Sequence, residues 1–422
     1  MKYHIWSLGC QMNMSDAERI ATTLESINYT PASTEKEADL IVVVSCSVRQ
    51  SAIDRIHGKI RNWNLRKTKE PLVTVLTGCV LDEDRLAFKK VFDLVFDIEN
   101  LAQLPAMLAD KTAEAEKEIE NYFKIIPRYT SAFQAFVPIM TGCNNFCSYC
   151  AVPYVRGREY SRPHTEIIAE VRTLLKNGYK EITLLGQNVN SYGNDNPKEI
   201  TFPELVQLVN DESDDFWLRY ITSHPKDMSD ELIKKFIQAS KLTDYLHLPL
   251  QSGSNEILKK MNRHYIYEHY KKLIEKVRAE KPDIAISTDI IVGFPGETNE
   301  QFMHTVRAFE EIKYDMAYIS QYSPRSGTAA AKLEDDVPKP EKKHREKVLT
   351  DILAKTALKH NKKYLDKEVT ILADRYQKGV LFGRSGSFKL VAVKTEPRDL
   401  IGKFVKVKIT DANAWALTGE MA

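Results

Sequence analysis

The sequence predicts an α/β protein with three parts: an N-terminal parallel sheet covered by helices, a central partial (β/α)6 barrel and a small C-terminal β-barrel. Three observations lead to this prediction. Apolar or β-branched runs alternate with segments of helical length up to about residue 330. Boundary-like stretches occur near residue 127 and at residues 335–345, and after residue 365 the pattern contains strand-like runs alone. We therefore predict domains at residues 1–126, 127–356 and 357–422, in keeping with roughly 150 residues per domain.

The N-terminal part contains four strand candidates with amphipathic segments between them. The strand candidates are residues 3–8, 39–44, 72–76 and 93–97, and the segments include residues 16–27 and 48–63. Strands that alternate with helices in this way are typical of βαβ units and of a parallel sheet. Residues 109–123 are rich in Ala, Glu and Lys, so we expect a connecting helix or linker there.

The central part repeats the alternation over a longer stretch. Six strand candidates lie at residues 135–140, 181–185, 217–222, 245–250, 285–292 and 316–322. An open barrel of this kind gathers its chemistry at the carboxyl ends of the strands. A charged helix at residues 345–365 then leads into strand-like runs at residues 369–373, 379–383, 388–393 and 404–409, which predict the small β-barrel.

Composition excludes several classes of protein. Hydrophobic residues at 43% and charged residues at 28% are ordinary globular values and argue against disorder. No apolar run approaches the roughly 18 to 20 residues that cross a bilayer, and the N-terminus has no signal-peptide h-region. We expect a cytoplasmic protein that is not bound to a membrane. In such a compartment six cysteines among 422 residues favour metal binding or catalysis over disulfides.

The charge is unevenly distributed along the chain. The whole chain has a formal net charge of +2, which by itself argues neither for nor against a nucleic-acid partner. Residues 361–422, however, carry 12 basic and 7 acidic residues. The C-terminal part is therefore the basic one.

Three of the six cysteines lie in one short loop. Cys143, Cys147 and Cys150 have C-x3-C-x2-C spacing and follow the first strand candidate of the central domain. Thiolates are the usual ligands of iron–sulfur clusters, and a cubane cluster with three protein ligands keeps one iron open for a substrate or cosubstrate. The alternatives are a chance grouping or a zinc knuckle. Zinc would need a fourth ligand, and the nearest histidine, His164, lies 14 residues further on.

The other three cysteines are distant in sequence but regularly placed. Cys10, Cys46 and Cys79 are 36 and 33 residues apart, and each follows a predicted strand. Successive βα units run about 30 residues or more, so the three thiols should meet at the carboxyl edge of one sheet, where open α/β sheets bind ligands. We expect a second three-cysteine cluster there. The alternative is three isolated buried cysteines.

At these residues the chain resembles the radical S-adenosylmethionine superfamily, whose C-x3-C-x2-C signature has an aromatic residue, here Tyr149, before the last cysteine. More narrowly it is similar to the methylthiotransferases, which add an N-terminal three-cysteine domain and a C-terminal TRAM domain. The resemblance covers essentially the whole chain. The matching stretches are Gly9-Cys10-Gln11-Met12-Asn13, Cys150-Ala151-Val152-Pro153-Tyr154-Val155-Arg156-Gly157-Arg158-Glu159-Tyr160-Ser161-Arg162 and Thr222-Ser223-His224-Pro225.

Within that family, Gln11-Met12 favours the branch that modifies isopentenyladenosine in tRNA. Small departures from its usual pattern occur at Ser7-Leu8, Ile266 and Ser326. The expected reaction is methylthiolation of C2 of N6-isopentenyladenosine next to the anticodon. The C2–H bond is neither acidic nor electrophilic, so acid–base catalysis has little to act on and a radical is required.

The resemblance implies two [4Fe-4S] clusters and S-adenosyl-L-methionine, which serves as methyl donor and as radical source. Cys143, Cys147 and Cys150 would hold the cluster that binds and cleaves the cosubstrate. The remaining three cysteines would hold an auxiliary cluster from which sulfur is delivered. All six are thus implied as metal ligands and as catalytic residues: Cys10, Cys46, Cys79, Cys143, Cys147 and Cys150.

Further residues are implied as contacts of S-adenosylmethionine. Most of them follow strands on the catalytic edge, whereas Tyr149 lies in the cysteine loop and would present its backbone or ring to the adenine. For each segment the alternative role is that of an ordinary βα turn. For Tyr149 the alternative is simple packing beside the cluster. The candidates are Tyr149, Gly186, Gln187, Asn188, Gln251, Ser252 and Gly293. His224, in contrast, is expected to be a turn or core residue rather than a base.

The expected partners are the tRNA anticodon stem-loop and a low-potential electron donor such as flavodoxin or ferredoxin, and we expect a monomer. Bases in loops can be splayed out for recognition, and chemistry on a base requires unstacking it. A basic run follows the cysteine loop and either borders the RNA entry or forms a solvated face. Its members are Arg156, Arg158 and Arg162. The basic tail fits an RNA-gripping barrel, with an unused surface as the alternative; its residues are Lys389, Lys394, Lys403, Lys406, Lys408, Phe382, Phe388 and Phe404.

Two rival functions stay open at this stage. The first keeps the chemistry and changes the substrate to a ribosomal-protein aspartate or to threonylcarbamoyl-adenosine in tRNA. The second is a non-catalytic iron–sulfur regulator that binds RNA.

Overall fold

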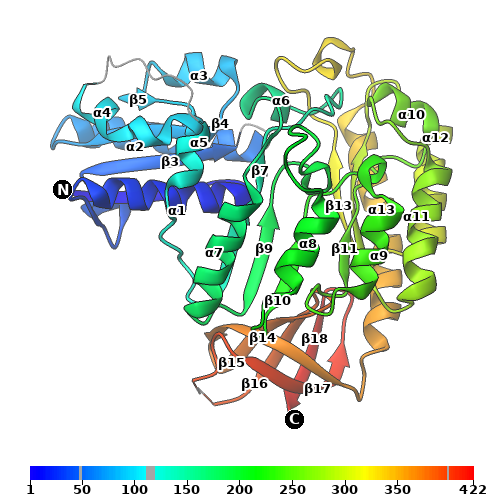
Figure 1. Cartoon of the computed structure of the whole chain (residues 1–422). Coiled ribbons are helices and arrows are strands. Elements are labelled where there is room, and N and C mark those ends of the chain that lie inside the picture. The colour runs from blue at the N-terminus through cyan, green and yellow to red at the C-terminus, as the bar shows by residue number, and fades with distance from the viewer. Residues whose placement is uncertain (47–49, 111–118, 397–398) are drawn as a thin grey trace.

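The computed structural model describes residues 1–46, 50–110, 119–396 and 399–422 and has the three predicted parts (Figure 1). The α/β class, the N-terminal parallel sheet, the central β/α domain and the C-terminal barrel are confirmed. Two predicted segments fall partly outside the described residues, at positions 48–49 and at positions 111–118 of the expected linker.

The N-terminal domain is a five-stranded parallel sheet with the order β2-β1-β3-β4-β5. Its central strand β3 is buried along its whole length, as expected for a parallel sheet covered on both faces. Val42 and Val44 pack on one face with α1, whereas Ile41 and Val43 pack on the other with α2. The elements are β1 (Lys2–Ser7), α1 (Gln11–Ser26), β2 (Thr30–Pro31), β3 (Leu40–Cys46), α2 (Gln50–Lys67), β4 (Val73–Cys79), α3 (Asp82–Phe88), β5 (Leu94–Val95), α4 (Leu104–Ala109) and α5 (Ile119–Lys124).

The central domain consists of two three-stranded parallel sheets, β6-β9-β10 and β11-β12-β13, joined by a bridge between Leu218 and Leu242. One hydrophobic core passes through both sheets. All six predicted strands are present: β6 (Gln134–Pro138), β9 (Glu181–Leu185), β10 (Trp217–Tyr220), β11 (Tyr245–His247), β12 (Ala285–Val292) and β13 (Met316–Gln321).

Helices cover the outside of these strands (Figure 1). They are α7 (His164–Lys176), α8 (Phe202–Asn210), α9 (Asp230–Gln238), α10 (Asn255–Lys260), α11 (Tyr267–Glu280) and α12 (Asn299–Ile312). Near the start of the domain lie the shorter elements β7 (Met140–Thr141), α6 (Val152–Val155) and β8 (Tyr160–Ser161).

The long helix α13 (Lys339–Lys362) leads from the central domain into the C-terminal one and spans the boundary predicted at residues 356–357. A closed barrel with the order β14-β15-β16-β18-β17 follows. Its fifth strand was not predicted. The strands are β14 (Glu368–Gln377), β15 (Val380–Ser385), β16 (Leu390–Lys394), β17 (Phe404–Ala412) and β18 (Ala416–Met421). Among the described residues, no helix is both long enough and apolar enough to span a membrane.

The barrel packs against the amino-terminal ends of the central strands (Figure 1). Trp217 and Tyr245, the first residues of β10 and β11, contact Phe404 and Phe388, with ring centroids 4.8 Å apart in both pairs. Lys389 is 9% exposed, and its Nζ lies 2.7 Å from Asp315. The prediction that Lys389 grips RNA is therefore wrong, because the domain interface buries it. Phe388 and Phe404 also pack against the central domain.

Candidate active site at the carboxyl edge of the strands

Cys10, Cys46 and Cys79 meet at the carboxyl edge of the N-terminal sheet. Cys46 and Cys79 end β3 and β4 and are direct partners in the parallel register. Cys10 stands immediately before α1. Gly9 has a φ of +147°, and a Cβ atom at this position would lie 2.9 Å from the Cβ of Cys46. Glycine is required here because it lets the Cys10 segment approach β3 this closely.

Asn13 fixes the position of Cys10 relative to the sheet. Its side chain is fully buried. The Nδ2 atom donates a hydrogen bond of 2.6 Å to the carbonyl of Ser45, and the Cys10 Sγ lies 3.4 Å from Oδ1. The first turn of α1 is thereby tied to the end of β3, next to Cys46.

The electrostatics of Cys79 reflect the closeness of the three thiols. Burial raises the pKa of Cys79 to about 12, and the neighbouring Cys46 and Cys10 add to the rise, while the Arg156 guanidinium opposes it. Like charges close together disfavour ionisation. Without metal, Cys79 is therefore held as a thiol, and a bound cation would have to displace its proton.

The loop with Cys143, Cys147 and Cys150 is shaped by its backbone. Gly142 has a φ of +77°, and a Cβ atom there would come within 1.9 Å of the Arg158 carbonyl oxygen. Asn262 donates hydrogen bonds to the carbonyls of Asn145 and Phe146, and these bonds also hold the loop in place. Local backbone fit, rather than side-chain packing alone, thus gathers these cysteines.

The thiols of this loop also lie close to one another. Burial raises the pKa of Cys143 to about 11 and that of Cys150 to about 12, and Cys147 contributes to both shifts. Among the described residues, no three His, Cys, Asp or Glu side chains are placed to surround a single metal ion. A multi-iron cluster spreads its ligands over several irons, whereas one zinc ion holds each thiolate at about 2.3 Å. The all-thiolate donor sets suit a cluster.

Unpaired polar atoms collect beyond β9, β10 and β11. Asn188 and Gln251 are buried, and their side-chain oxygens make no hydrogen bond, nor does the buried Oε1 of Gln187. Buried polar atoms normally have partners, so these three oxygens are acceptors that the fold itself does not satisfy. The donors of a bound S-adenosylmethionine fit this arrangement.

His224 belongs to the same group, although it also caps a turn. Burial lowers the pKa of His224, helped by the positive charges of Arg263 and Lys226, so the ring is neutral. Its Nδ1 accepts the backbone N–H of Lys226 at 3.2 Å. The proton must then reside on Nε2, which is buried without a partner. His224 therefore has the expected turn role, and its Nε2–H is in addition an unused hydrogen-bond donor.

Other predicted contact residues are engaged within the protein. The Ser252 hydroxyl accepts a hydrogen bond from the Ser254 N–H at 3.2 Å. The N–H of Gly293 donates to Glu297 at 2.6 Å. Gly186 packs so tightly that a Cβ atom would lie 2.5 Å from Met140, and Tyr149 packs against a small apolar cluster. At Ser252 and Gly293 the structure shows βα-turn roles.

The three arginines after the cysteine loop differ in their surroundings. Arg156 and Arg162 are 2% and 5% exposed, and they form ion pairs with Asp16 and Glu170. Neither is available to RNA, so that alternative is corrected for both, and so is the alternative of a solvated face. Arg158 is exposed and lies over the ring of Phe146. It alone of the three can face a nucleic acid.

Sequence reasoning missed two residues beside the cysteines. Arg263 donates to the Cys147 Sγ at 3.3 Å, and Asp16 binds Arg156, which donates to the Cys79 Sγ at 3.1 Å. In sequence both are ordinary charged residues. Asp16 lies near Cys10 on α1, but nothing in the sequence pairs it with Arg156, which is 140 residues away.

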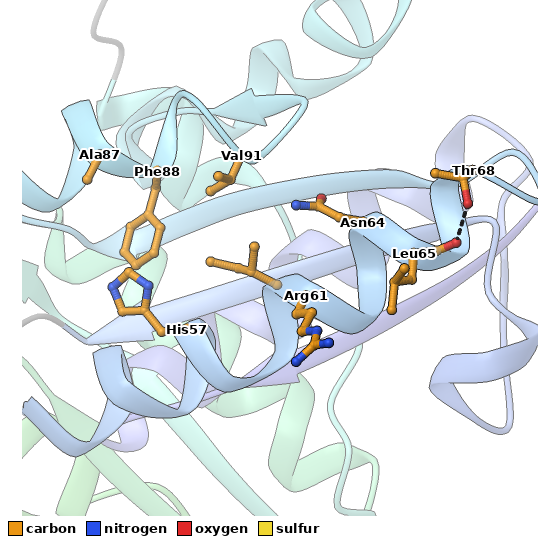
Figure 2. A pocket seen from close by; sticks show the side chains of 9 residues that line it. His57, Arg61, Asn64, Leu65, Thr68, Ala87, Phe88 and Val91 are labelled. Carbon is orange, nitrogen blue, oxygen red and sulfur yellow. Dashed lines mark hydrogen bonds between the residues drawn. The ribbon is translucent and has the colours of Figure 1, made fainter.

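A pocket between α2 and α3 is a separate feature (Figure 2). Its lining includes His57, Arg61, Leu65 and Phe88, and it contains none of the six cysteines or the predicted contacts of the cosubstrate. This pocket is therefore separate from the residues gathered at the carboxyl edge.

Comparisons with known proteins agree with this arrangement. Residues 137–309 match the Radical SAM superfamily, residues 2–97 match Uncharacterized protein family UPF0004, and residues 363–422 match the TRAM domain. A tRNA-2-methylthio-N(6)-dimethylallyladenosine synthase of Thermoanaerobacter sp. (strain X514) is 42% identical over 435 residues, covering 99% of this chain and 92% of the relative. The chain belongs to the radical S-adenosylmethionine methylthiotransferase family.

Two further methylthiotransferases with the same name show the same extent of similarity. The protein of Clostridium tetani (strain Massachusetts / E88) is 42% identical over 434 residues, covering 99% of this chain and 96% of the relative. That of Caldicellulosiruptor saccharolyticus (strain ATCC 43494 / DSM 8903 / Tp8T 6331) is 44% identical over 434 residues, covering 99% and 92%. Similarity of this extent spans all three domains of the methylthiotransferase.

Among solved structures, the radical S-adenosylmethionine methyltransferase TsrM from Kitasatospora setae, with cobalamin and a [4Fe-4S] cluster bound, has a TM-score of 0.56. Its sequence is 12% identical, and the match covers 78% of this chain and 77% of that one. At this identity the similarity concerns the fold.

Proposed function

We propose that this methylthiotransferase converts N6-isopentenyladenosine next to the anticodon of tRNA to its 2-methylthio derivative. One observation carries the proposal: chains of this name are 42–44% identical over 99% of the sequence. The two cysteine sets, each gathered at the carboxyl edge of its sheet, agree with it. When bound, the two [4Fe-4S] clusters and S-adenosylmethionine supply the radical, the methyl group and the sulfur.

We assign each cysteine set one cluster. Cys143, Cys147 and Cys150 would hold the cluster that binds the cosubstrate, and the sheet-edge set, Cys10, Cys46 and Cys79, would hold the auxiliary one. Three thiolates per set keep one iron of each cluster open. The protein's own contribution is to gather each set at or after the ends of its strands and to bury four of the six thiols.

The unpaired polar atoms would orient S-adenosylmethionine. Asn188 and Gln251 offer acceptors to its donors, and the His224 Nε2–H offers a donor to an acceptor such as its carboxylate. Asn188 is itself fixed by a hydrogen bond of 2.8 Å from its Nδ2 to Asp227. Asn188 and His224 are thus held by hydrogen bonds before the ligand arrives, which reduces the cost of ordering the site.

The tRNA anticodon stem-loop is the proposed substrate, with the exposed basic face of the barrel as part of its binding surface. Exposed side chains there include Lys394, Lys403, Lys406 and Lys408. Cluster reduction calls for a low-potential electron donor, and flavodoxin or ferredoxin would serve. We place the enzyme in the cytoplasm as a monomer.

Nucleoside analysis of tRNA tests the proposal. A strain that lacks this gene should lose 2-methylthio-N6-isopentenyladenosine and accumulate N6-isopentenyladenosine, and the wild-type gene should restore the product. Unchanged 2-methylthio content in the deletion strain contradicts the proposal. Mass spectrometry of ribosomal proteins and of threonylcarbamoyl-adenosine in the same strains identifies the rival substrates.

Removing one cysteine set tests the division of labour. The triple variant C10A/C46A/C79A should bind about half the iron and still release 5′-deoxyadenosine from S-adenosylmethionine, without methylthiolated tRNA. A regulator that only binds RNA would release no 5′-deoxyadenosine even as the wild-type chain. Loss of both clusters in the triple variant contradicts the two-site assignment.

A further inference from the structure

Each cysteine set receives a hydrogen bond from one buried arginine. The Arg156 Nε lies 3.1 Å from the Cys79 Sγ, and the Arg263 Nη1 lies 3.3 Å from the Cys147 Sγ. The two arginines are 2% and 8% exposed. A buried guanidinium is costly unless anions and acceptors compensate it, so both contacts require a structural reason.

Arg156 is part of a network that connects two domains. It follows α6 of the central domain, yet its guanidinium binds Asp16 on α1, with Nη2–Oδ2 and Nη1–Oδ1 distances of 2.5 and 3.3 Å. Asp16 also accepts the hydroxyl of Tyr122 at 2.6 Å. The Asp16 carboxylate therefore balances most of the positive charge that Arg156 presents to Cys79.

Arg263 lacks such a balance. Its other hydrogen bonds go to the Tyr265 hydroxyl at 2.9 Å and to the Pro249 carbonyl at 3.2 Å, which are both neutral. No carboxylate of the described residues forms an ion pair with it. Asp227 lies within electrostatic range of Arg263 but forms no ion pair with it. A cluster bound through the Cys147 sulfur would therefore be the negatively charged group in direct contact with this guanidinium.

We propose that Arg156 and Arg263 are positioning residues that set the reduction potentials of the two clusters separately, Arg156 for the auxiliary cluster and Arg263 for the cluster of the cysteine loop. The inference rests on the proposed function, because it requires a cluster on each cysteine set. Hydrogen bonds to sulfur and nearby positive charge favour the more negatively charged, reduced state. Because Asp16 screens Arg156, the effect of Arg156 is the smaller one.

The test measures reduction potentials on the full-length chain by redox titration followed by electron paramagnetic resonance. Each cluster is observed alone by removing the other cysteine set with three Cys→Ala substitutions. R263Q should lower the equilibrium constant for reduction of the loop cluster at least tenfold, which is about 59 mV for one electron. It should leave the auxiliary cluster unchanged.

Arg156 is tested with charge-balanced variants, since R156Q alone leaves Asp16 buried without a partner. D16N should raise the potential of the auxiliary cluster, because it removes the screening charge. The reduction potential of this cluster in R156Q/D16N should be lower than in D16N. R156K keeps the positive charge, so its potential should lie nearer to the wild-type value than that of R156Q/D16N. None of these variants should move the loop cluster.

Each outcome decides the inference. Equal potentials of the loop cluster in R263Q and the wild type, or a potential of the auxiliary cluster in R156Q/D16N at or above that in D16N, would overturn it. If R156Q/D16N loses iron from the auxiliary site alone, the positioning role is supported, while loss of iron from both sites means a general folding role and overturns it. A wild-type chain that binds no iron or makes no 2-methylthio product would instead overturn the proposed function.

Discussion

Single residues set the geometry of the site, and Gly142 is the clearest case. We expect G142A to abolish cluster binding by the cysteine loop, because its new Cβ would meet the Arg158 carbonyl at 1.9 Å. Gly178 provides a matched control: its φ is +85°, but nothing lies within 4 Å of the added atom. G178A should cost about 1 kcal/mol of backbone strain and keep the iron content. Iron and sulfide analysis distinguishes the two, and normal iron in G142A would contradict the prediction.

Two adjacent residues in the loop after β11 should separate ligand binding from stability. The side-chain oxygen of Gln251 has no partner, so Q251A should weaken S-adenosylmethionine binding about tenfold with little change in melting temperature. Ser252 is fully buried and supports the backbone of Ser254. S252A should instead destabilise the fold by about 1–3 kcal/mol. Equilibrium dialysis and thermal unfolding measure both effects, and a reversed pattern would refute this assignment.

The sequence predicts where the cysteines lie in the fold better than it predicts which charged side chains are buried. Spacing and strand order placed Cys10, Cys46 and Cys79 at one edge because parallel register is regular. The same reasoning could not tell the exposed Arg158 from the buried Arg156 two residues earlier. Which arginine is buried depends on Asp16 in another domain, and no local pattern contains that information.

At the scale of elements, strands with continuous apolar runs were predictable and a mixed strand was not. β3 reads LIVVVSC and is buried throughout, which is typical of the interior of a parallel sheet. β18 reads ALTGEM, and its Gly419 leaves little strand signal. It forms because barrel closure places it between β16 and β17, a tertiary cause that a short sequence window does not show.

The attachment of the C-terminal barrel depends on one buried carboxylate at the start of β13. Asp315 pairs with Lys389 at 2.7 Å and His360 at 3.0 Å. D315N leaves Lys389 buried without a counter-charge, so we expect a loss of about 3–5 kcal/mol and faster hydrogen exchange in the barrel. The control is D283N, which removes an exposed pair with Lys363 and should cost at most about 1 kcal/mol. Equal effects of the two would contradict the role given to Asp315.

The same carboxylate predicts a dependence on pH. Burial alone would raise the pKa of Asp315, but His360 and Lys389 outweigh it and lower the pKa to about 2. Because the folded pKa lies below the unfolded value, the stabilisation is complete above about pH 4 and is lost as the pH falls toward 2. It amounts to about 2 kcal/mol. Urea unfolding between pH 2 and 6 should show the gap between wild type and D315N shrinking below pH 4, whereas a constant gap would refute the assignment.

For the whole molecule, the arrangement separates chemistry from the barrel. Both cysteine sets lie at the carboxyl ends of their strands, and the barrel contacts the amino ends of the central ones (Figure 1). The eight residues of β12 span about 26 Å at about 3.3 Å per residue. An RNA that contacts the barrel and presents a base to the clusters must therefore extend along the outside of the central domain.

Charge reversal on the barrel should consequently weaken RNA binding without affecting the chemistry of the cosubstrate. Lys406 and Lys408 are exposed on β17, and K406E/K408E should lower tRNA affinity at least tenfold and reduce its dependence on salt, because fewer counterions are released. Release of 5′-deoxyadenosine without tRNA should stay at the wild-type rate, since these lysines lie at the opposite end of the strands from the cysteine loop. K272E/K276E changes the net charge equally on exposed positions of α11 and should leave tRNA affinity within about twofold. Filter binding at several salt concentrations measures both. If the two double variants weaken binding equally, net charge rather than the barrel face attracts the RNA, and the barrel would then have no specific part in gripping it.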